Sequence, residues 1–422
     1  MRAMLIEFSV ANYASFRARQ TLSMAAAPQL RKKENLFEVK LGKDKLPKLL
    51  KAVAIYGPNA SGKSNLLQAL EDLGKIVGNK PTTQEIPLNV SSFRFDKSLA
   101  DQPSEFEVHF VKDSCRYSYE LHATRERICL ERLIHYPNGV EKLLYHRERM
   151  ALGEHYKYGE SLEGGSDLHA VWSKLTGPKT TFISQAVANS NEELTQLSKP
   201  FSWLTKACIF VSGDMTPIAD QAQDLLRKSP NLRESLEQLL GEVDIPISKI
   251  RIDKTSDHNK EFLANSPLTH ERKDSLVTVL THKTALGEAD FNFWEESKGT
   301  QNLMGFWLPW TVFRIGAEDD GMGQILVVDE LDASLHPSIA AELVRRTIAA
   351  DSGACQLIFT THNTNLMDRK ILRRDQFWLT ERDENGATQL RSVYDFRGRG
   401  DEDIEKRYFE GRYRALPHVV SK

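Results

Sequence analysis

The sequence predicts an α/β fold built around a glycine-rich loop, and three short stretches carry this prediction. The apolar run Ala52–Tyr56 leads into GPNASGKSN at residues 57–65, and residues 66–70 (LLQAL) continue with a helical pattern. Two later apolar runs of strand length, Ile325–Val328 and Gln356–Thr360, are typical of strands that a sheet buries on both faces. We therefore expect strands followed by polar loops at one edge of an α/β sheet.

The composition is that of an ordinary globular protein. Of the 422 residues, 40% are hydrophobic and 27% are charged, which allows a normal core, and the length suggests two or three structural units. The formal net charge of −2 gives no overall attraction to nucleic acid or to an anionic membrane. No apolar run approaches the roughly 18 residues of a membrane span, so no membrane partner is expected. The cysteines are scattered without metal-type spacing, which favours reduced thiols and a cytoplasmic location: Cys115, Cys129, Cys208 and Cys355.

The glycine-rich loop matches the phosphate-binding pattern G-x4-G-K-[ST]. Its glycines allow backbone N–H groups to converge on phosphate oxygens without a clashing Cβ. Lys63 can reach the β- and γ-phosphates, Ser64 can ligate Mg²⁺, and the following helix directs its positive end at the same anion. A chance match of four fixed positions arises in roughly one per cent of chains of this length. The expected nucleotide-binding residues of this stretch are Gly57, Asn59, Gly62, Lys63, Ser64 and Asn65.

Two acidic residues follow the second apolar strand. Open α/β sheets bind ligands at the carboxyl ends of their strands, which is where Asp329 and Glu330 lie. We expect Asp329 to hold Mg²⁺ through water and Glu330 to orient and deprotonate an attacking water. The alternative is a strand end with two solvated acids, and the presence of the phosphate-binding loop makes it the weaker interpretation.

Two further motifs accompany these strands. Asp332 opens DASLHP directly after the acidic pair, and His362 follows the third strand in TTHN. A histidine at a strand end can contact a γ-phosphate and report its presence. Taken alone, His362 is more simply explained as an ordinary surface histidine. The functional interpretation therefore depends on the presence of the other motifs.

The order of these motifs resembles ABC-type ATPases, in the branch that contains SMC, Rad50, RecF and OLD-type proteins. The stretches then correspond to the Walker A, Walker B, D-loop and H-loop motifs. The resemblance implies a signature motif shortly before Walker B, and ESKGTQ at residues 296–301 is similar to a degenerate LSGGQ. It implies that Ser297 and Gly299 contact the γ-phosphate bound to a second subunit, with ATP and Mg²⁺ as cofactors and a homo-oligomer of at least two chains. The simpler interpretation, a polar helix N-cap at Ser297, describes the same physical object.

The wider chain resembles the prokaryotic AAA15/AAA21 group of stand-alone ABC-type ATPases. The stretches that carry this are MLIEFSVANYASF, SEFEVHF, EESKGT and DQFWLTERDENG, within a resemblance that covers most of residues 4–418 and is weakest at about 145–275. This group is similar to the ATPase subunits found beside nucleases in anti-phage and abortive-infection systems. The implied function is a Mg²⁺-dependent ATPase switch that controls a partner effector, with a nuclease as the expected partner.

The resemblance also implies a domain organisation. Residues 1–145 and 276–422 are expected to form one ABC-type α/β ATPase head, and residues 146–275 a mainly helical insert. The alternative function is a DNA-repair or DNA-end-binding ATPase of RecF or Rad50 type, with DNA as partner. The lack of long heptad arrays and the near-neutral charge favour the effector-controlling switch.

Two features stay open at this point. The glutamine of the family's Q-loop is Gln84 or Gln102, and the sequence does not choose between them. Near the C-terminus, basic and aromatic residues between 406 and 414 suit either a nucleic-acid or partner surface or a solvated, partly packed tail. Neighbouring acids nearly cancel the basic charge, which favours the packed tail.

Overall fold

The chain divides into two compact units. The computed structural model describes residues 3–39, 41–80, 86–191, 193–212, 216–243, 245–254, 276–315, 325–333, 335–349, 355–397 and 403–416. The larger unit comprises Met1–Val211, Val312–Asp332 and Ala340–Lys422, and the smaller unit comprises Ser212–Thr311 and Ala333–Ile339. Each unit is described by itself below.

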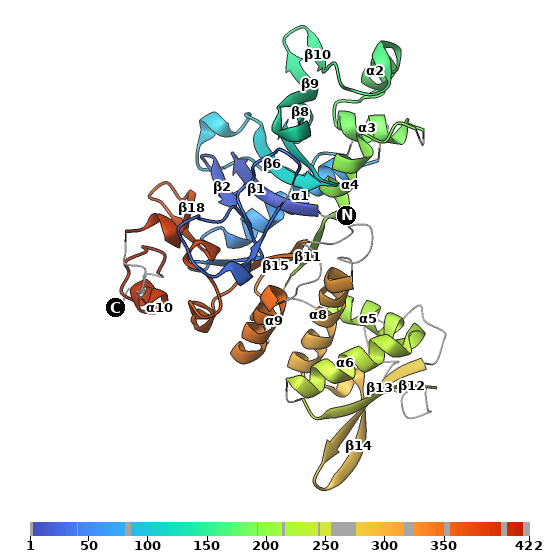
Figure 1. The fold of residues 1–422 in the computed structure, drawn as a ribbon, viewed down its shortest axis with the longest axis vertical. Helices are drawn as coiled ribbons and strands as arrows, with labels where there is room; N and C mark the ends of the chain where they lie inside the picture. The colour runs from blue at the N-terminus through green and yellow to red at the C-terminus, as the bar shows by residue number, and fades with distance from the viewer. Residues whose placement is uncertain are drawn as a thin grey trace. The chain divides into compact units, whose positions relative to one another are not determined.

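An antiparallel sheet forms one layer of the larger unit (Figure 1), with strand order β10-β9-β8-β7-β6-β1-β2. Its strands alternate: Phe106, Val108 and Phe110 are buried, whereas Glu107 and His109 between them are only half-buried. One face of the sheet therefore packs on the core and the other faces solvent. The strands are β1 (Ala3–Ala11), β2 (Gln20–Ser23), β6 (Ser104–Lys112), β7 (Cys115–Ala123), β8 (Ile128–Tyr136), β9 (Lys142–Met150) and β10 (Gly153–Tyr158).

The second sheet contains the predicted motif strands and has the order β11-β15-β16-β5-β17-β18. Strands β11 to β17 pair in parallel and β18 is antiparallel to β17. Strand β16 lies between β5 and β15, so the carboxyl ends of all three open on the same edge. These apolar strands are fully buried, which confirms the predicted α/β fold. The strands are β5 (Ala52–Tyr56), β11 (Cys208–Val211), β15 (Ile325–Val328), β16 (Gln356–Thr360), β17 (Phe377–Arg382) and β18 (Thr388–Ser392).

Helix α1 (Lys63–Gly78) joins the cores of the two sheets. Its apolar stripe, which includes Leu66 and Leu70, belongs to the same buried cluster as Phe8 of β1 and Val53 of β5. The other helices assigned wholly or mostly to this unit, and two short strands, are α2 (Gly165–Leu175), α3 (Phe182–Ala188), α4 (Ser198–Lys206), α9 (Pro337–Ala349), α10 (Ile404–Phe409), β3 (Leu36–Phe37) and β4 (Leu49–Leu50).

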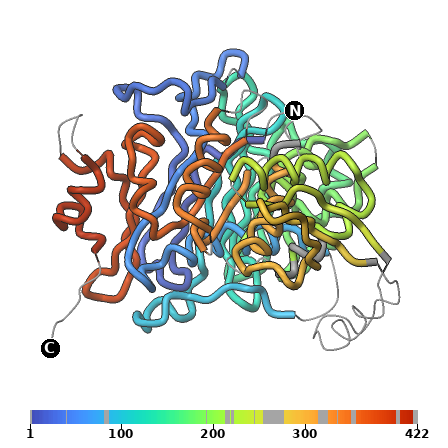
Figure 2. The backbone as a smooth tube through the Cα atoms, turned by 90° about the horizontal axis from the view of Figure 1, so that it is seen from below, coloured from blue at the N-terminus to red at the C-terminus, as the bar shows by residue number. Residues whose placement is uncertain are grey.

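The N-terminal and C-terminal parts of the chain meet in the larger unit. Figure 2 shows the blue N-terminal segments beside the red C-terminal ones, and the backbone N–H of Leu390 donates to Gln20 Oε1 over 2.7 Å. In the C-terminal segment, Tyr408 and Tyr413 are buried, whereas Phe409 is 60% exposed. The segment is therefore partly packed, with some of its side chains open to solvent.

The smaller unit is a three-stranded sheet with helices, in the order β12-β13-β14 for its described strands. Helix α6 begins at Pro230 after the N-cap residue Ser229 and buries Leu236 and Leu240 in a core shared with Trp307. No helix in the described ranges is long and apolar enough to cross a membrane. The elements are α5 (Thr216–Lys228), α6 (Pro230–Glu242), β12 (Ile247–Lys254), β13 (Leu276–Thr284), β14 (Gly287–Asn292) and most of α8 (Lys298–Ile315).

Residues 146–275, the expected insert, contain helices α2 to α6 but also strands. Strands β9 and β10 complete the antiparallel sheet, and β11 lies at the edge of the parallel sheet, inside a stretch that the sequence predicts as helical. Strand β11 is only four residues long, and its pairing partner β15 lies far along the chain, so no local pattern separates it from the flanking helices. The limits 1–145, 146–275 and 276–422 thus differ from those of the compact units.

Candidate nucleotide-binding site

The glycine-rich loop connects the carboxyl end of β5 to the first residue of α1, as the sequence predicts. Gly62 caps the helix with a left-handed φ of 102°, and Ala60 is also left-handed at 61°. A Cβ atom at Gly62 would lie 2.1 Å from Thr388 Oγ1, and one at Gly57 would lie 2.3 Å from Thr380 Oγ1. Both glycines are therefore required by close approach of the loop to the β17–β18 hairpin.

Lys63 lies under this loop and is 6% exposed. Its Nζ donates to the carbonyl oxygens of Gly57 (2.8 Å) and Pro58 (3.2 Å). Burial lowers the pKa of Lys63, and the negative charges of Asp329 and Glu330 partly oppose this effect. The lysine and the acids that follow β15 are thus close enough to interact through their charges.

Thr360, the last residue of β16, organises the acidic pair. Its hydroxyl donates to Asp329 Oδ1 (2.5 Å), and the backbone N–H of Glu330 donates to the same hydroxyl oxygen (2.7 Å). Glu330 adopts a left-handed φ of 57°, an unusual conformation for a glutamate, and its side chain is exposed at the sheet edge. The sequence reveals no role for Thr360, because a threonine at a strand end carries no distinctive pattern.

Asp332 and His362 meet at the same edge. The backbone N–H of His362 lies 3.3 Å from each carboxylate oxygen of Asp332 and donates to them. His362 is exposed to solvent. The turn after β15 and the turn after β16 are therefore linked through Asp332.

The oxygen atoms predicted to hold Mg²⁺ belong to Ser64, the second residue of α1, and Asp329. A hydroxyl and a carboxylate are hard oxygen ligands, which Mg²⁺ prefers, usually in the company of water and phosphate oxygens. The donor set therefore fits this ion, and the bond from Thr360 restrains the Asp329 carboxylate. Over the described ranges, no cluster of three or more histidine, cysteine, aspartate or glutamate side chains has the geometry of a metal site.

The signature candidates Ser297 and Gly299 belong to the smaller unit, whereas the other predicted site residues belong to the larger unit. Ser297 Oγ accepts a hydrogen bond from the backbone N–H of Thr300 (3.2 Å) and so caps α8. Gln301 Nε2 donates to the carbonyl oxygen of Glu296 (3.1 Å). The expected helix N-cap is therefore present.

The remaining candidates have mixed surroundings. Asn59 is exposed at the tip of the loop, and Asn65 Nδ2 donates to Ser15 Oγ (2.8 Å), a residue that the sequence did not single out. Gln102 is exposed beside β6, and Gln84 lies outside the described residues, so the Q-loop residue stays undecided.

One family model and several solved structures are similar to this chain. The family described as "AAA domain, putative AbiEii toxin, Type IV TA system" (AAA_21) matches residues 52–368, which is more than half of the chain. Among solved structures, the SMC head domain from Thermotoga maritima is similar at 14% identity and a TM-score of 0.41, covering 93% of this chain and 99% of that one. An SMC head bound to the C-winged helix domain of ScpA is similar at 12% identity and 0.44, covering 95% and 99%. No curated protein sequence matches. By its match to this family model, the chain belongs to the AAA_21 family.

Proposed function

We propose that the protein hydrolyses ATP to ADP and phosphate with Mg²⁺ and uses this reaction to control a partner protein. The observation that supports this best is the sheet edge itself. There, the buried Lys63 lies under the glycine-rich loop, within range of the charges of Asp329 and Glu330. A cation beneath a cradle of backbone amides, with acids across from it, is suited to a polyphosphate and its metal ion.

Each residue then has a distinct task. Lys63 exchanges its bonds to the loop carbonyls for bonds to the β- and γ-phosphates. Ser64 and Asp329 would hold Mg²⁺, which neutralises phosphate charge when bound. Glu330 takes the proton of the attacking water, and His362 contacts the γ-phosphate. Loss of the base in Glu330→Gln should lower the rate of phosphate release by about 10²–10⁴-fold while ATP binding persists.

We further propose that two chains form composite ATP sites, in which Ser297 and Gly299 of one chain face the γ-phosphate on Lys63 of the other. The supporting observation is the N-terminus of α8, where Ser297 caps a helix of 18 residues whose positive end suits an anion. Mixing Lys63→Ala chains with Ser297→Arg chains gives heterodimers that retain one intact composite site. We expect ATPase activity to reappear on mixing. A mixture as inactive as each variant alone, with heterodimers demonstrated, would contradict a trans site able to act singly.

The proposed docking surface for the partner is on the insert, about residues 146–275, or on the C-terminal segment 397–417, and the following contacts favour the second. Tyr56, which ends β5 directly before the phosphate-binding loop, donates its hydroxyl to the carbonyl oxygen of Asn363 (3.2 Å), next to His362. Its ring lies 6.4 Å from that of Tyr408 in α10. A change in the contacts of His362 on hydrolysis can therefore pass through Tyr56 to α10.

The proposed setting is the cytoplasm, with a nuclease as partner in anti-phage defence. The test is to express the chain with its neighbouring genes and purify it with ATP, with ADP, and as Glu330→Gln, using Lys63→Ala as the nucleotide-free control. We expect the amount of co-purified partner to differ between the Glu330→Gln and Lys63→Ala preparations. For the His362→Ala protein, the amount of partner should be the same with ATP as with ADP. A chain without a nucleotide-dependent partner that binds DNA ends tightly would instead support the DNA-repair function.

A further inference from the structure

Two threonines of the β17–β18 hairpin press against the phosphate-binding loop, and both are completely buried. Thr380 Oγ1 lies 3.2 Å from the carbonyl oxygen of Tyr56 and 2.5 Å from Ser61 Oγ. Thr388 Oγ1 lies 2.9 Å from the carbonyl oxygen of Ser61. The hairpin thus holds a backbone carbonyl just before Gly57 and another just before Gly62.

A third segment completes this arrangement. Ser15, in the turn between β1 and β2, places its Oγ 2.7 Å from Thr388 Oγ1, and Asn65 Nδ2 of α1 donates to Ser15 Oγ over 2.8 Å. A hydroxyl carries one proton, and a carbonyl only accepts. Thr388 Oγ1 donates toward the Ser61 carbonyl and toward Ser15 Oγ, so these two acceptors share its one proton, and Ser15 Oγ also accepts from Asn65.

The turn that carries Ser15 is itself fixed. Asn12 and Ala14 have left-handed φ angles of 46° and 48°, and the backbone N–H of Ala14 donates to Ser91 O over 2.6 Å. The hydroxyl of Tyr13 donates to Asp72 Oδ2 of α1 over 2.6 Å. Ser15 therefore reaches Thr388 from a rigid support and not from a loose surface loop.

The anchored carbonyls have a consequence for phosphate binding. In a trans peptide, the C=O and the following N–H point in opposite directions. Because the Ser61 carbonyl is directed at Thr388, the N–H of Gly62 is directed away from the hairpin. Likewise, the Tyr56 carbonyl is directed at Thr380, so the N–H of Gly57 is directed away from the hairpin. A Cβ atom at either glycine would clash with a threonine of the hairpin, so the close approach that these bonds require depends on glycine at both positions.

We infer that Thr388, supported by Ser15, is a positioning residue that orients the loop amides before ATP arrives. This inference rests on the proposed ATPase function. It predicts that loss of the Thr388 hydroxyl weakens ATP binding because the Ser61 carbonyl loses its donor and the loop no longer has one preferred conformation.

The experiment compares Thr388→Val, which removes the hydroxyl, with Thr388→Ser, which keeps it, in the full-length chain. The dissociation constant for MgATP is measured by calorimetry, and the melting temperature is measured without nucleotide. We expect Thr388→Val to bind about tenfold more weakly and Thr388→Ser to stay near wild type. Thr347→Val is the matched control: this buried hydroxyl bonds to Leu343 O within α9, so its loss should affect stability and leave ATP affinity unchanged.

Should Thr388→Val fail to fold, Ser15→Ala removes the oxygen that links Thr388 to Asn65 of α1, so the position of Thr388 is less fixed and ATP binding should also weaken. Unchanged affinity in the folded Thr388→Val or Ser15→Ala protein, beside a wild type that binds ATP, would overturn the inference alone. Equal weakening by Thr388→Ser would also overturn it, because the hydroxyl would then not be the active group. A wild type that binds no ATP would overturn the proposed function and, with it, this inference.

Discussion

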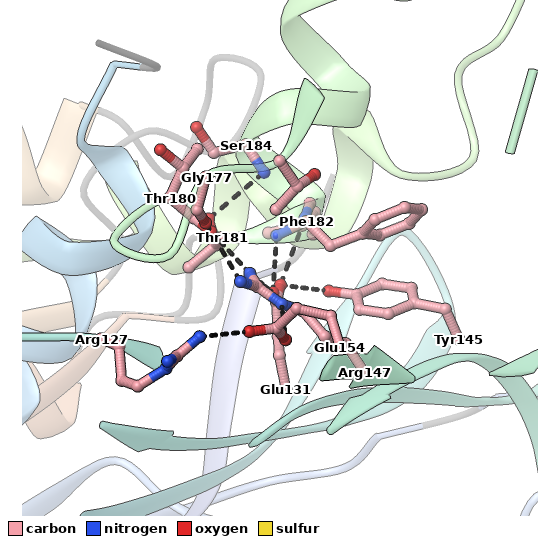
Figure 3. A network of polar contacts seen from close by, with 12 residues as sticks. Arg127, Glu131, Tyr145, Arg147, Glu154, Gly177, Thr180, Thr181, Phe182 and Ser184 are labelled. Atoms are coloured by element: carbon pink, nitrogen blue, oxygen red, sulfur yellow. Dashed lines mark hydrogen bonds and ion pairs between the residues drawn. The ribbon is translucent and has the colours of Figure 1, made fainter. Parts of the chain in front are cut away.

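The larger unit contains a second polar cluster, the Glu131–Arg147 network (Figure 3), and it differs from the edge of the parallel sheet in where its polar groups find their partners. Glu131 is fully buried, and its carboxylate accepts hydrogen bonds from Tyr145 OH (2.7 Å) and from the backbone N–H groups of Phe182 (2.5 Å) and Ile183 (3.2 Å). The hydroxyl of Tyr119 also donates to this carboxylate, over 3.2 Å.

The arginine of the network is equally engaged. Arg147 Nε donates to Glu154 Oε2 (3.1 Å), Nη1 to Thr180 O (2.7 Å) and Nη2 to Gly177 O (3.0 Å), while Nη1 lies 3.9 Å from Glu131 Oε2. These bonds tie the turn before α3 to strands β8 and β9. The charged groups of the network form their hydrogen bonds with other groups of the protein, and these bonds stabilise the local fold.

At the sheet edge, by contrast, the bonds are ones that a ligand can replace. Lys63 donates to carbonyls of the loop that it serves, and the nearby carboxylates of Asp329 and Glu330 act on it through their charge. Glu330 and His362 are exposed. The difference indicates that charge burial alone does not identify a functional site: a site keeps exchangeable bonds and accessible groups, whereas a structural cluster is closed.

The largest expected effect is that of Lys63→Ala on ATP binding. Removing a buried, hydrogen-bonded cation from an anion site costs about 2–5 kcal/mol, so affinity should fall by roughly 30-fold to several thousand-fold. The free energy of unfolding should stay within about 1 kcal/mol of wild type, because the loop carbonyls can bond to water. Calorimetry with MgATP and urea unfolding measure the two quantities.

Lys51 provides a matched control for this variant. It is similarly buried but precedes β5, at the opposite end of the strand from the loop, and its Nζ donates to Ile348 O over 2.6 Å. Lys51→Ala should therefore lower stability and leave ATP affinity unchanged. If Lys63→Ala lowered the stability and left the ATP affinity unchanged, Lys63 would have a structural role and the sheet edge would not be the ATP site.

The second prediction concerns the network. Glu131→Gln puts an amide NH₂ group in front of donors that need an acceptor, and the free energy of unfolding should fall by about 3 kcal/mol. The ATP affinity of the folded protein should not change. Glu154→Gln, at the more exposed end of the same network, should cost about 1 kcal/mol. A Glu131→Gln variant as stable as wild type would show that the network is not needed for the fold.

The sequence predicts those elements of the fold and those residues of the candidate site that have a recognisable local pattern. Ile325–Val328 and Gln356–Thr360 are uniformly apolar, and the loop before Lys63 has a fixed glycine spacing, so each is recognisable within a few residues. The same holds for Asp329 and Glu330, which directly follow an apolar strand.

The parts that the sequence does not predict depend on contacts between distant segments. Ser15 and Thr388 are ordinary polar residues until the fold brings them within 2.7 Å of each other. Glu131 and Arg147 look like solvated charges on neighbouring strands, but contacts that include the turn before α3 and the start of α3 bury them. Hydroxyl and charge networks of this kind have no sequence period that could reveal them.

The smallest effect is expected on the outer face of the antiparallel sheet, where charges are paired but open to water. The hydrogen bond from His109 Nε2 (2.9 Å), together with Arg19, lowers the pKa of Glu107 from its ordinary 4.5 to about 2. Because the folded-state pKa is the lower one, the folded protein binds fewer protons. The stabilisation is therefore complete above about pH 4.5 and is lost as the pH falls toward 2.

Solvent screening limits what this pair contributes, so Glu107→Gln should cost at most about 1 kcal/mol at pH 7. The difference in the free energy of unfolding between the variant and wild type should persist at pH 6 and shrink between pH 4 and pH 3, because the unfolded wild-type chain then takes up a proton at Glu107 that the folded protein does not yet bind. Urea unfolding across this range measures it. A difference that stays constant down to pH 3 would mean that Glu107 stabilises the fold through packing and not through its charge. The outer face of the sheet would then resemble the Glu131–Arg147 network, whose groups are bonded within the protein.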